Sequence, residues 1–310
     1  MNHLLRELAP FGDDAWAMLD AEARDRLVPA LTARRVVDFD GPRGWQYSAV
    51  DLGRTEPVTG PDSRTEPVTG PDSRTEPVTG PDSRTEPATG AETRTEPATA
   101  STASTAGIVA RRRRVLPLCE VRATFTVRLE EMVDFSRGAT DVDLTDLDQA
   151  ALRLAAHENR ATLRGWTEAG ITGVGAASTQ RSQTHDGTPE SFRTAVTAAV
   201  AALRDAGVAG PYALACGPVD WAEIVETDDG GYPLRKQLEG ITGGDVERTP
   251  GIDESVLISQ RGGDFVLTVG EDLSLGYLHH DADAVTLYVE ESFAFRVNTP
   301  EAAVVLRRAL

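Results

Sequence analysis

The feature that most constrains the fold is a block of three segments within residues 261–297, each with apolar residues at every second position. Alternation of this kind is typical of β-strands that bury one face. Turns are predicted between the segments at Gly262-Gly263 and around His280-Asp281. The block therefore predicts a sheet, and it holds almost none of the residue types that a catalytic site needs. The alternating residues are Phe265, Leu267 and Val269, then Leu273, Leu275 and Tyr277, then Val285, Leu287 and Val289.

Helices and strands are mixed elsewhere, which predicts an α+β fold without the strict alternation of a nucleotide-binding fold. Apolar residues at three- and four-residue spacing predict an amino-terminal helix, which Pro29 is expected to kink or split. Further helices are predicted over residues 144–166 and from the Thr188 cap to Gly207. Residues 115–129 alternate cleanly and predict one long strand. The stripe of the amino-terminal helix consists of Trp16, Leu19, Ala23, Leu27 and Leu31.

Residues 54–103 form five consecutive ten-residue repeats, RTEPVTGPDS three times and then RTEPATGAET and RTEPATASTA. Every unit contains proline and none contains an aromatic residue, so the array cannot offset an ordering entropy of roughly 1–2 kcal/mol per residue. We expect it to be disordered or extended in a polyproline conformation. It is either a slippage expansion, tolerated because loop closure entropy grows slowly with length, or selected for surface decoration or altered subunit contacts.

Composition excludes several kinds of partner. The chain has 31 Lys and Arg against 49 Asp and Glu, a formal charge of −18, which disfavours nucleic acid and anionic membranes. The only basic run, residues 111–114, is expected to pair with acids of an adjacent subunit or of its own loop.

Cys119 and Cys216 are expected to be buried free thiols in a reducing cytoplasm rather than a disulfide. Because the sequence shows neither an export signal nor a long apolar run, we expect a soluble, cytoplasmic protein.

No constellation of catalytic or metal-ligating residues stands out, and we predict neither an enzyme nor a bound cofactor or metal. His279-His280-Asp281 is interpreted as a solvated turn, because adjacent side chains point in divergent directions. The pair His157-Glu158 lacks the second histidine of a helical zinc site and is interpreted as a polar helix face. Glu290 and Glu291 are expected on opposite faces of a strand, so they cannot act as one acid/base pair.

Several long runs carry a family resemblance. They are residues 7–27 (ELAPFGDDAWAMLDAEARDRL), 34–50 (RRVVDFDGPRGWQYSAV), 116–125 (LPLCEVRATF) and the block at 261–297, with GPYAL, GYPL and NTPEA following in family order at 210, 231 and 298. Together these runs closely resemble the encapsulins, bacterial and archaeal shell proteins built on the phage capsid fold. The resemblance covers most of the 310 residues and fails over about 52–111.

The resemblance implies an α+β phage major capsid (Hong Kong 97-type) fold with a peripheral domain, an axial domain and an extended loop. In relatives this loop, with arms expected here at 47–52 and 108–118, reaches over a neighbouring subunit. The implied boundaries are 1–46 for the amino-terminal helix and peripheral domain, 47–118 for the extended loop with its repeats, 119–177 for the peripheral domain with its spine helix, 178–260 for the axial domain, and 261–310 for the carboxy-terminal strands of the peripheral domain.

The implied function is that of a self-assembling icosahedral nanocompartment subunit that encloses cargo enzymes through their carboxy-terminal targeting peptides. Typical cargo of the family is a dye-decolourising peroxidase, a ferritin-like protein or a haemerythrin-like protein. The peptide groove is implied between the amino-terminal helix and the peripheral domain, with Arg34 and Asp38 fixing the register. Its leucines could instead pack the helix onto its own sheet. The matching residues are Leu27, Leu31, Arg34, Val37, Asp38 and Phe39, with Leu275 and Tyr277 from the late strands.

A second implied site is the loop that lines a five-fold pore. Symmetry copies of its two carboxylates would favour cations over anions. Without the resemblance the same residues predict only a turn. Relatives that hold a flavin have an aromatic residue near the helix after the TFT strand; residues 128–132 contain none, and no flavin is predicted. The pore residues are Asp228, Asp229, Gly230, Gly231 and Tyr232.

Two alternative functions are compatible with parts of the sequence. A prophage major capsid protein has the same fold and packages DNA, but the acidic charge and the groove residues favour the nanocompartment. A secreted bacteriocin or protease would require an export signal and a nucleophile or metal site, and neither is visible in the sequence.

Overall fold

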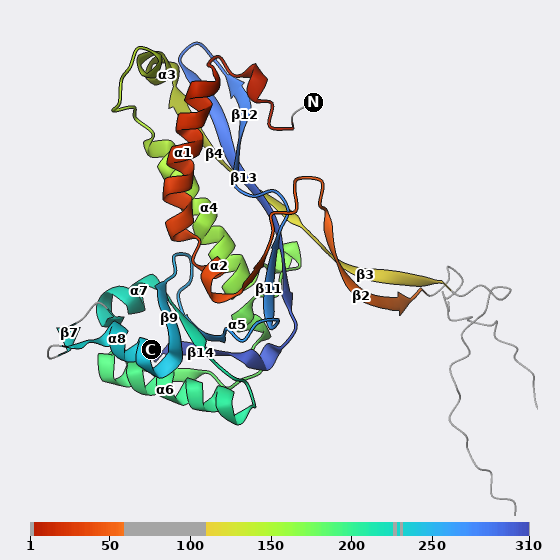
Figure 1. Cartoon of the computed structure of the whole chain (residues 1–310), viewed down its shortest axis with the longest axis vertical. Coiled ribbons are helices and arrows are strands. Elements are labelled where there is room, and N and C mark those ends of the chain that lie inside the picture. Colours follow the sequence, from red (N-terminus) through yellow and green to blue (C-terminus); the bar gives the residue numbers. More distant parts are fainter. Residues whose placement is uncertain (1–2, 59–109, 226–227, 230–231, 310) are drawn as a thin grey trace, which may run out of the picture. The chain divides into compact units, whose positions relative to one another are not determined.

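The computed structural model describes residues 3–58, 110–225, 228–229 and 232–309 (Figure 1). These residues divide into two compact units. The larger unit comprises residues 1–50 and 115–310, and the smaller one comprises residues 51–114.

Helices and strands alternate irregularly along the chain, as an α+β fold requires. The helices are α1 (Asp13–Ala30), α2 (Ala33–Val36), α3 (Leu129–Ser136), α4 (Thr145–Leu163), α5 (Val174–Ala177), α6 (Pro189–Asp205), α7 (Pro218–Asp220) and α8 (Leu234–Thr242), with single turns η1 (Arg6–Leu8), η2 (Thr167–Ala169), η3 (Trp221–Val225) and η4 (Pro300–Ala302). The strands are β1 (Asp38–Asp40), β2 (Ala49–Pro57), β3 (Arg111–Pro117), β4 (Cys119–Arg128), β5 (Gln183–His185), β6 (Tyr212–Cys216), β7 (Asp228–Asp229), β8 (Tyr232–Pro233), β9 (Gly243–Arg248), β10 (Ser255–Ser259), β11 (Phe265–Val269), β12 (Ser274–His280), β13 (Ala284–Val297) and β14 (Ala303–Arg308).

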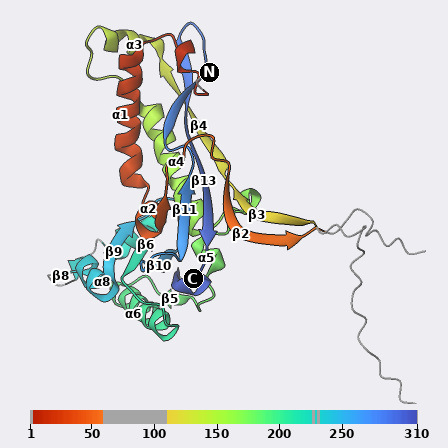
Figure 2. The same cartoon turned by 45° about the vertical axis from the view of Figure 1, so that its right-hand side comes forward.

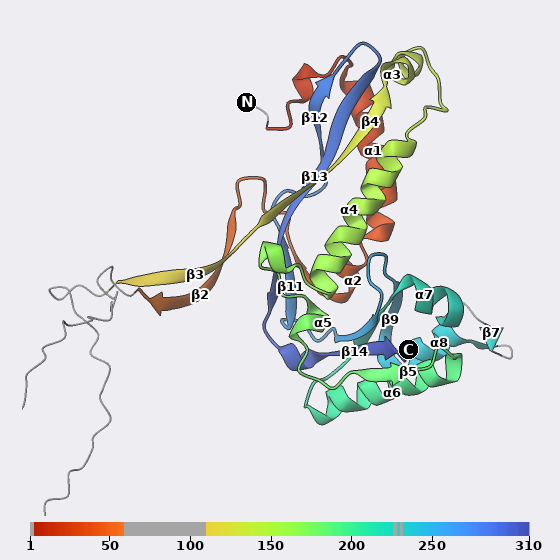
Figure 3. The same cartoon turned by 180° about the vertical axis from the view of Figure 1, so that it is seen from behind.

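The long strand β13 organises the first sheet of the larger unit, whose order is β1-β11-β13-β12 with β4 also paired to β13. Strand β4 runs antiparallel along residues 284–293, while β12 and β11 share the other edge of β13. Helices α1 and α4 lie side by side against this sheet (Figures 1 and 3). Their apolar faces and the strands enclose one core, in which Leu19, Leu147 and Leu287 are fully buried.

The second sheet has the order β5-β14-β10-β6-β9 and packs against α6 and α8 (Figure 2). Its strands β6 and β10 are buried along their whole length. Strand β14 pairs with β10 and β5, so residues 303–308 belong to this sheet. Residues 303–308 therefore lie in a different sheet from β11, β12 and β13, with which the resemblance groups them in the expected peripheral domain.

The periodic signals predicted most elements correctly. The stripe of α1 is buried, and Pro29 lies in the last turn, one residue before the helix ends. The Thr188 side chain accepts a hydrogen bond from the Ser191 amide at 3.3 Å, which caps α6 as predicted. The three segments of the late block are β11, β12 and the first half of β13. In the second half of β13 both faces are buried, which alternation alone does not predict.

The predicted long strand over residues 115–129 is wrong in one respect, because it breaks at Leu118. The Leu118 amide donates to the Ser48 carbonyl at 2.9 Å, and on either side of it the chain changes partner. Strand β3 pairs with β2, whereas β4 pairs with β13.

In the smaller unit, β2 and β3 form a two-stranded ribbon. The basic run pairs with its own loop, one of the two predicted arrangements: Arg112 contacts Glu56, and Arg113 contacts Asp51 at 3.0 Å. Hydrogen bonds from the Gly53 amide and Arg113 lower the pKa of the Asp51 carboxyl below its usual value. Both arginines and Asp51 are exposed and Glu56 is partly exposed, so each pair adds little to stability.

The repeat array begins inside this ribbon. Residues 54–57, the RTEP of the first repeat, form the end of β2 and do not fit the prediction of disorder. The rest of that prediction concerns residues 59–103, which lie outside the described residues.

Both cysteines are free, as predicted. Cys216 is buried in β6, and burial raises the pKa of its thiol well above the usual value. Cys119 is only half-buried, so the expectation of two buried thiols is correct for Cys216 alone.

Candidate functional site

The predicted groove residues fall into two groups. Leu27, Leu31, Leu275 and Tyr277 lie in the core between α1 and the first sheet, and the three leucines are almost completely buried. Their burial matches the alternative in which they pack the helix onto its own sheet.

The second group lies beyond α1, on α2 and β1. Phe39 is exposed, and the guanidinium of Arg34 lies 5.1 Å from its ring centroid. Val37 and Asp38 are half-buried, and the Asp38 carboxylate accepts a hydrogen bond from the Gly263 amide. The two groups meet at Leu31 and Arg34.

A surface cavity of about 320 Å³ opens at this meeting point. It combines apolar side chains with arginines: Val28 is half-exposed, and among the described residues Arg24 has no ion-pair partner. A cavity of this composition suits an apolar side chain next to a polar or acidic group. The lining residues are Arg24, Val28, Leu31, Arg34, Arg35, Asp272 and Leu273.

Arg34 connects the elements around this cavity through a network of ion pairs. Its guanidinium contacts Glu158 of α4 at 2.6 Å, Glu291 of β13 at 3.0 Å and Asp272 at 2.8 Å. Both glutamates are fully buried, whereas Asp272 is partly exposed. Burial alone would lower the pKa of Arg34, but the three carboxylates raise it. Arg34 therefore ties α2 to the spine helix and to the central strand.

The interpretation of His157-Glu158 as a polar helix face is wrong at Glu158, and the polar residue after it is buried too. The Asn159 side chain donates to the carbonyls of Ala30 and Pro250 at 2.8 and 3.1 Å and accepts from the Ala33 amide at 2.8 Å. The bonds to Ala30 and Ala33 satisfy backbone groups where the chain turns from α1 into α2. The polar residues of α4 therefore position the candidate site from within the core.

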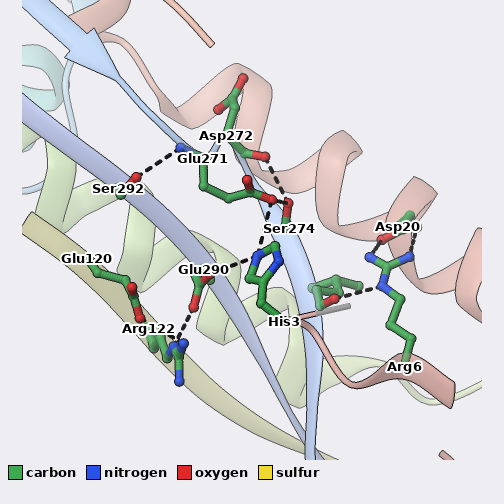
Figure 4. Close-up of polar contacts among 11 residues, drawn as sticks. His3, Arg6, Asp20, Glu120, Arg122, Glu271, Asp272, Ser274, Glu290 and Ser292 are labelled. Atoms are coloured by element: carbon green, nitrogen blue, oxygen red, sulfur yellow. Dashed lines mark hydrogen bonds and ion pairs between the residues drawn. The ribbon is translucent and has the colours of Figure 1, made fainter. Parts of the chain in front are cut away.

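Glu290 and Glu291 point to opposite sides of β13, as predicted. Glu291 contacts Arg34, whereas Glu290 contacts Arg122 of β4 and lies 3.7 Å from the His3 ring (Figure 4). Burial, followed by the charge of Glu158, raises the pKa of Glu291 well above its usual value. The folded protein therefore holds a proton on this carboxyl more tightly than the unfolded chain does.

A Glu291→Gln shell should lose less stability than the parent when the pH is raised. Because the folded-state pKa of Glu291 is raised, the folded state binds more protons than the unfolded state between about pH 4.3, the unfolded-state pKa, and the raised folded-state pKa. The stability of the folded protein falls as the pH rises between these two values. Glutamine has no proton to lose. The unfolding midpoints of both shells, measured from about pH 5 to about pH 9, should therefore diverge toward alkaline pH.

A matched control is Glu130→Gln, because the Glu130 side chain is 75% exposed and its contact with Arg128 at 3.8 Å is an exposed surface pair, which contributes little. Its pH profile should run parallel to that of the parent. A Glu291→Gln profile that also runs parallel would contradict the assignment.

The first described residues cross the edge of β12, and we call residues 3–9 the N-terminal strap. The Tyr277 amide donates to the Leu4 carbonyl at 2.8 Å, and Arg6 Nε donates to the Leu275 carbonyl at 2.8 Å. Arg6 also forms a two-bond ion pair with Asp20 of α1 at 2.7 and 2.8 Å (Figure 4). The strap therefore links α1 to two of the predicted groove residues.

Sequence reasoning missed the strap. His3 stacks on Trp45 at a centroid distance of 4.8 Å and faces Glu271 and Glu290, both far along the chain. No local spacing joins these residues. The only signal in the sequence is the pair of leucines before Arg6, which marks a short apolar segment ahead of α1.

The predicted pore loop is described only in part. Strands β7 and β8 pair antiparallel, with Asp228 opposite Pro233 and Asp229 opposite Tyr232. Gly230 and Gly231 lie outside the described residues.

Across residues 3–58, 110–225, 228–229 and 232–309, no cluster of three or more His, Cys, Asp or Glu side chains is arranged to hold a metal. Within the same ranges no helix is both long and apolar enough to cross a membrane.

The two sheets, the spine helix and the ribbon are those of the phage major capsid (Hong Kong 97-type) fold. A solved structure with this fold, the crystal structure of a virus-like particle from Pyrococcus furiosus, superposes with a TM-score of 0.50 at 22% identity, covering 63% of this chain and 79% of that chain. The fold class predicted from the sequence is thereby confirmed.

Sequence comparison defines the family within this class. The family described as encapsulating protein for peroxidase (Linocin M18) matches residues 1–79 and 78–294. A type 1 encapsulin shell protein of Rhodospirillum rubrum is 40% identical over 308 residues, which is 99% of this chain and 97% of that protein. One from Rhodococcus erythropolis is 34% identical over 306 residues, covering 99% and 100%. The chain belongs to the encapsulin family, and it is the subunit of a self-assembling shell.

Proposed function

We propose that the shell of this protein is an icosahedral cytoplasmic nanocompartment that encloses a cargo enzyme and performs no catalysis itself. The cargo is held by a carboxy-terminal targeting peptide at the groove residues: Leu27, Leu31, Arg34, Val37, Asp38, Phe39, Leu275 and Tyr277. The observation that carries this proposal is the cavity at the end of α1, in which exposed Val28 and Arg24 lie beside Leu31 and Arg34; within the described part of the chain Arg24 has no ion-pair partner.

A peroxidase is the first candidate for the cargo, because the matching family is described as encapsulating protein for peroxidase. Ferritin-like and haemerythrin-like proteins are the other candidates. The buried leucines lie beneath the groove and support its wall, while the exposed cavity residues contact the cargo peptide. Arg24 and Arg34 favour a peptide that brings a carboxylate or carbonyl group next to an apolar side chain.

The other parts of the chain have proposed roles in the shell. The first sheet with α1 and α4 is the peripheral domain, the second sheet with α6 and α8 is the axial domain, and the β2–β3 ribbon is the base of the extended loop that contacts a neighbouring subunit. The loop of Asp228 to Tyr232 lines the five-fold pore and favours the passage of cations.

A Val28→Asp shell should assemble normally but retain much less cargo, on the order of ten-fold less. Val28 is 51% exposed, so the substitution leaves the core intact while it places a carboxylate inside the cavity. The measurement is quantitative mass spectrometry of the contents of purified shells, with particle size checked by negative-stain microscopy.

The matched control is Val219→Asp, because Val219 has the same exposed fraction of 51% and lies in α7, outside the cavity. Its shells should retain cargo at the parental level. Equal cargo in the Val28→Asp and parent shells would refute the groove, and shells filled with nucleic acid would favour a DNA-packaging capsid.

A further inference from the structure

We propose that the outer edge of β12 is a docking site for an extended peptide with a basic side chain, and that the N-terminal strap occupies this site in competition with it. The docking site rests on the proposed function in one respect: the cargo peptide is the natural competitor of the strap. The strap would then set how readily a shell accepts cargo.

Strand β12 is an edge of the first sheet, since among the described strands its one partner is β13. In an antiparallel pair, alternate residues direct their N–H and C=O groups away from the partner strand. On β12 these residues are Leu275 and Tyr277, and the strap bonds to the carbonyl of the first and to the amide of the second. The strap therefore uses the groups to which an added strand would bind.

The strap uses this edge incompletely. Among the described strap residues, Leu4 supplies the one backbone bond seen to β12, because Leu5 adopts a left-handed conformation with φ of 53° that turns the chain into η1. That conformation is unfavourable for leucine. The Arg6 side chain takes the place of a second backbone donor. A peptide that stayed extended could form both bonds from its backbone.

The space between the strap and α1 is also unfilled. A cavity of about 460 Å³ lies there, lined by Arg6, Glu7, Phe11, Asp13, Trp16, Ala17 and Asp20. Asp20 would lose its partner if the strap left, and it would then attract a basic side chain of the incoming peptide in place of Arg6. This is the reason for assigning the peptide a basic residue.

The docking edge adjoins the cavity of the proposed cargo groove. Leu273, directly before β12, lines that cavity, and the carbonyl of Leu275, two residues further along the chain, accepts the bond from Arg6. On the other side, Val28 of α1 lines the cavity, and Asp20 of α1 forms the ion pair with Arg6 of the strap. One extended peptide alongside β12 could therefore reach both places, but only after the strap had moved.

The direct test uses the strap itself as the probe. A fluorescent peptide with the sequence of residues 3–9, HLLRELA, is titrated by anisotropy into assembled shells whose chain begins at Pro10, and into full-length shells. We expect binding to the shortened shell and at least about ten-fold weaker binding to the full-length shell, because a tethered segment has a high effective concentration. Matched peptides carry Leu4→Asp or Arg6→Glu and should not bind.

Equal binding to both shells, or no binding to an intact shortened shell, would overturn the proposal. If the shortened chain does not assemble, full-length Arg6→Gln replaces it. In that shell the Tyr277 amide should exchange its hydrogen about ten-fold faster than in the parent, since the strap loses its bonds to Asp20 and Leu275. Unchanged exchange would equally contradict the proposal.

A second arm separates this proposal from the proposed function. Cargo retention is compared between shortened and full-length shells that are produced under the same conditions. More cargo in the shortened shell supports competition at β12. The same cargo level in both would show that the strap does not compete. Cargo in neither would refute the cargo groove, while the peptide titration would still decide whether β12 is a docking edge.

Discussion

Replacing Arg34 with methionine should destabilise the subunit by about 3–5 kcal/mol, the usual cost of removing one partner from a buried ion pair. Arg34 is the cation that both Glu158 and Glu291 contact, and both glutamates are fully buried. Methionine keeps much of the apolar stem but leaves the two carboxyls without a counter-charge. They must then take up protons or admit water, and either change disturbs the contacts among α2, α4 and β13.

The neighbouring substitution Arg35→Met is the matched control. The Arg35 side chain is 44% exposed and contacts Glu247 at 3.0 Å, a surface pair worth about 0–1 kcal/mol. Urea unfolding of both variant shells and of the parent gives the comparison. The Arg34→Met shell should recover part of its stability at acidic pH, where the carboxyls are neutral. If Arg34→Met unfolds at the same urea concentration as Arg35→Met, the network does not stabilise the subunit.

Elements that repeat a short period could be predicted from the sequence. Strands β11 and β12 and helices α1, α4 and α6 each carry apolar residues at the spacing of their own geometry, and most of their boundaries lie within a few residues of the prediction. Strand β14 shows the limit of this approach. Its apolar run predicts that it is buried, but not which of the two sheets it joins.

The candidate site could be predicted only in outline. The resemblance implies a site at Arg34, but the contacts of that residue lie 124 positions away at Glu158 and 257 positions away at Glu291. A carboxylate on a helix is normally solvated, so Glu158 could not be recognised as buried before its partner was known. The strap could not be predicted for the same reason, because its partners on β12 lie about 270 residues further along the chain.

Replacing Leu27 with aspartate should destabilise the subunit by about 4 kcal/mol or more, because the side chain is completely buried within an apolar cluster. The adjacent Val28→Asp should change stability by less than about 0.5 kcal/mol, since its side chain is half-exposed. Urea midpoints of the two shells measure the difference. If Leu27→Asp proves as stable as Val28→Asp, Leu27 is not in the core.

The contrast between these neighbours determines how the groove has to be tested. Loss of cargo from a Leu27→Asp shell would follow from a damaged subunit whether or not Leu27 touches the peptide. Loss of cargo from a Val28→Asp shell that unfolds at the parental midpoint cannot be explained in that way. Substitutions of the exposed residues Arg24 and Val28 therefore test the groove directly. Leu27, Leu31 and Leu275 instead fix the positions of α1 and β12 on either side of it.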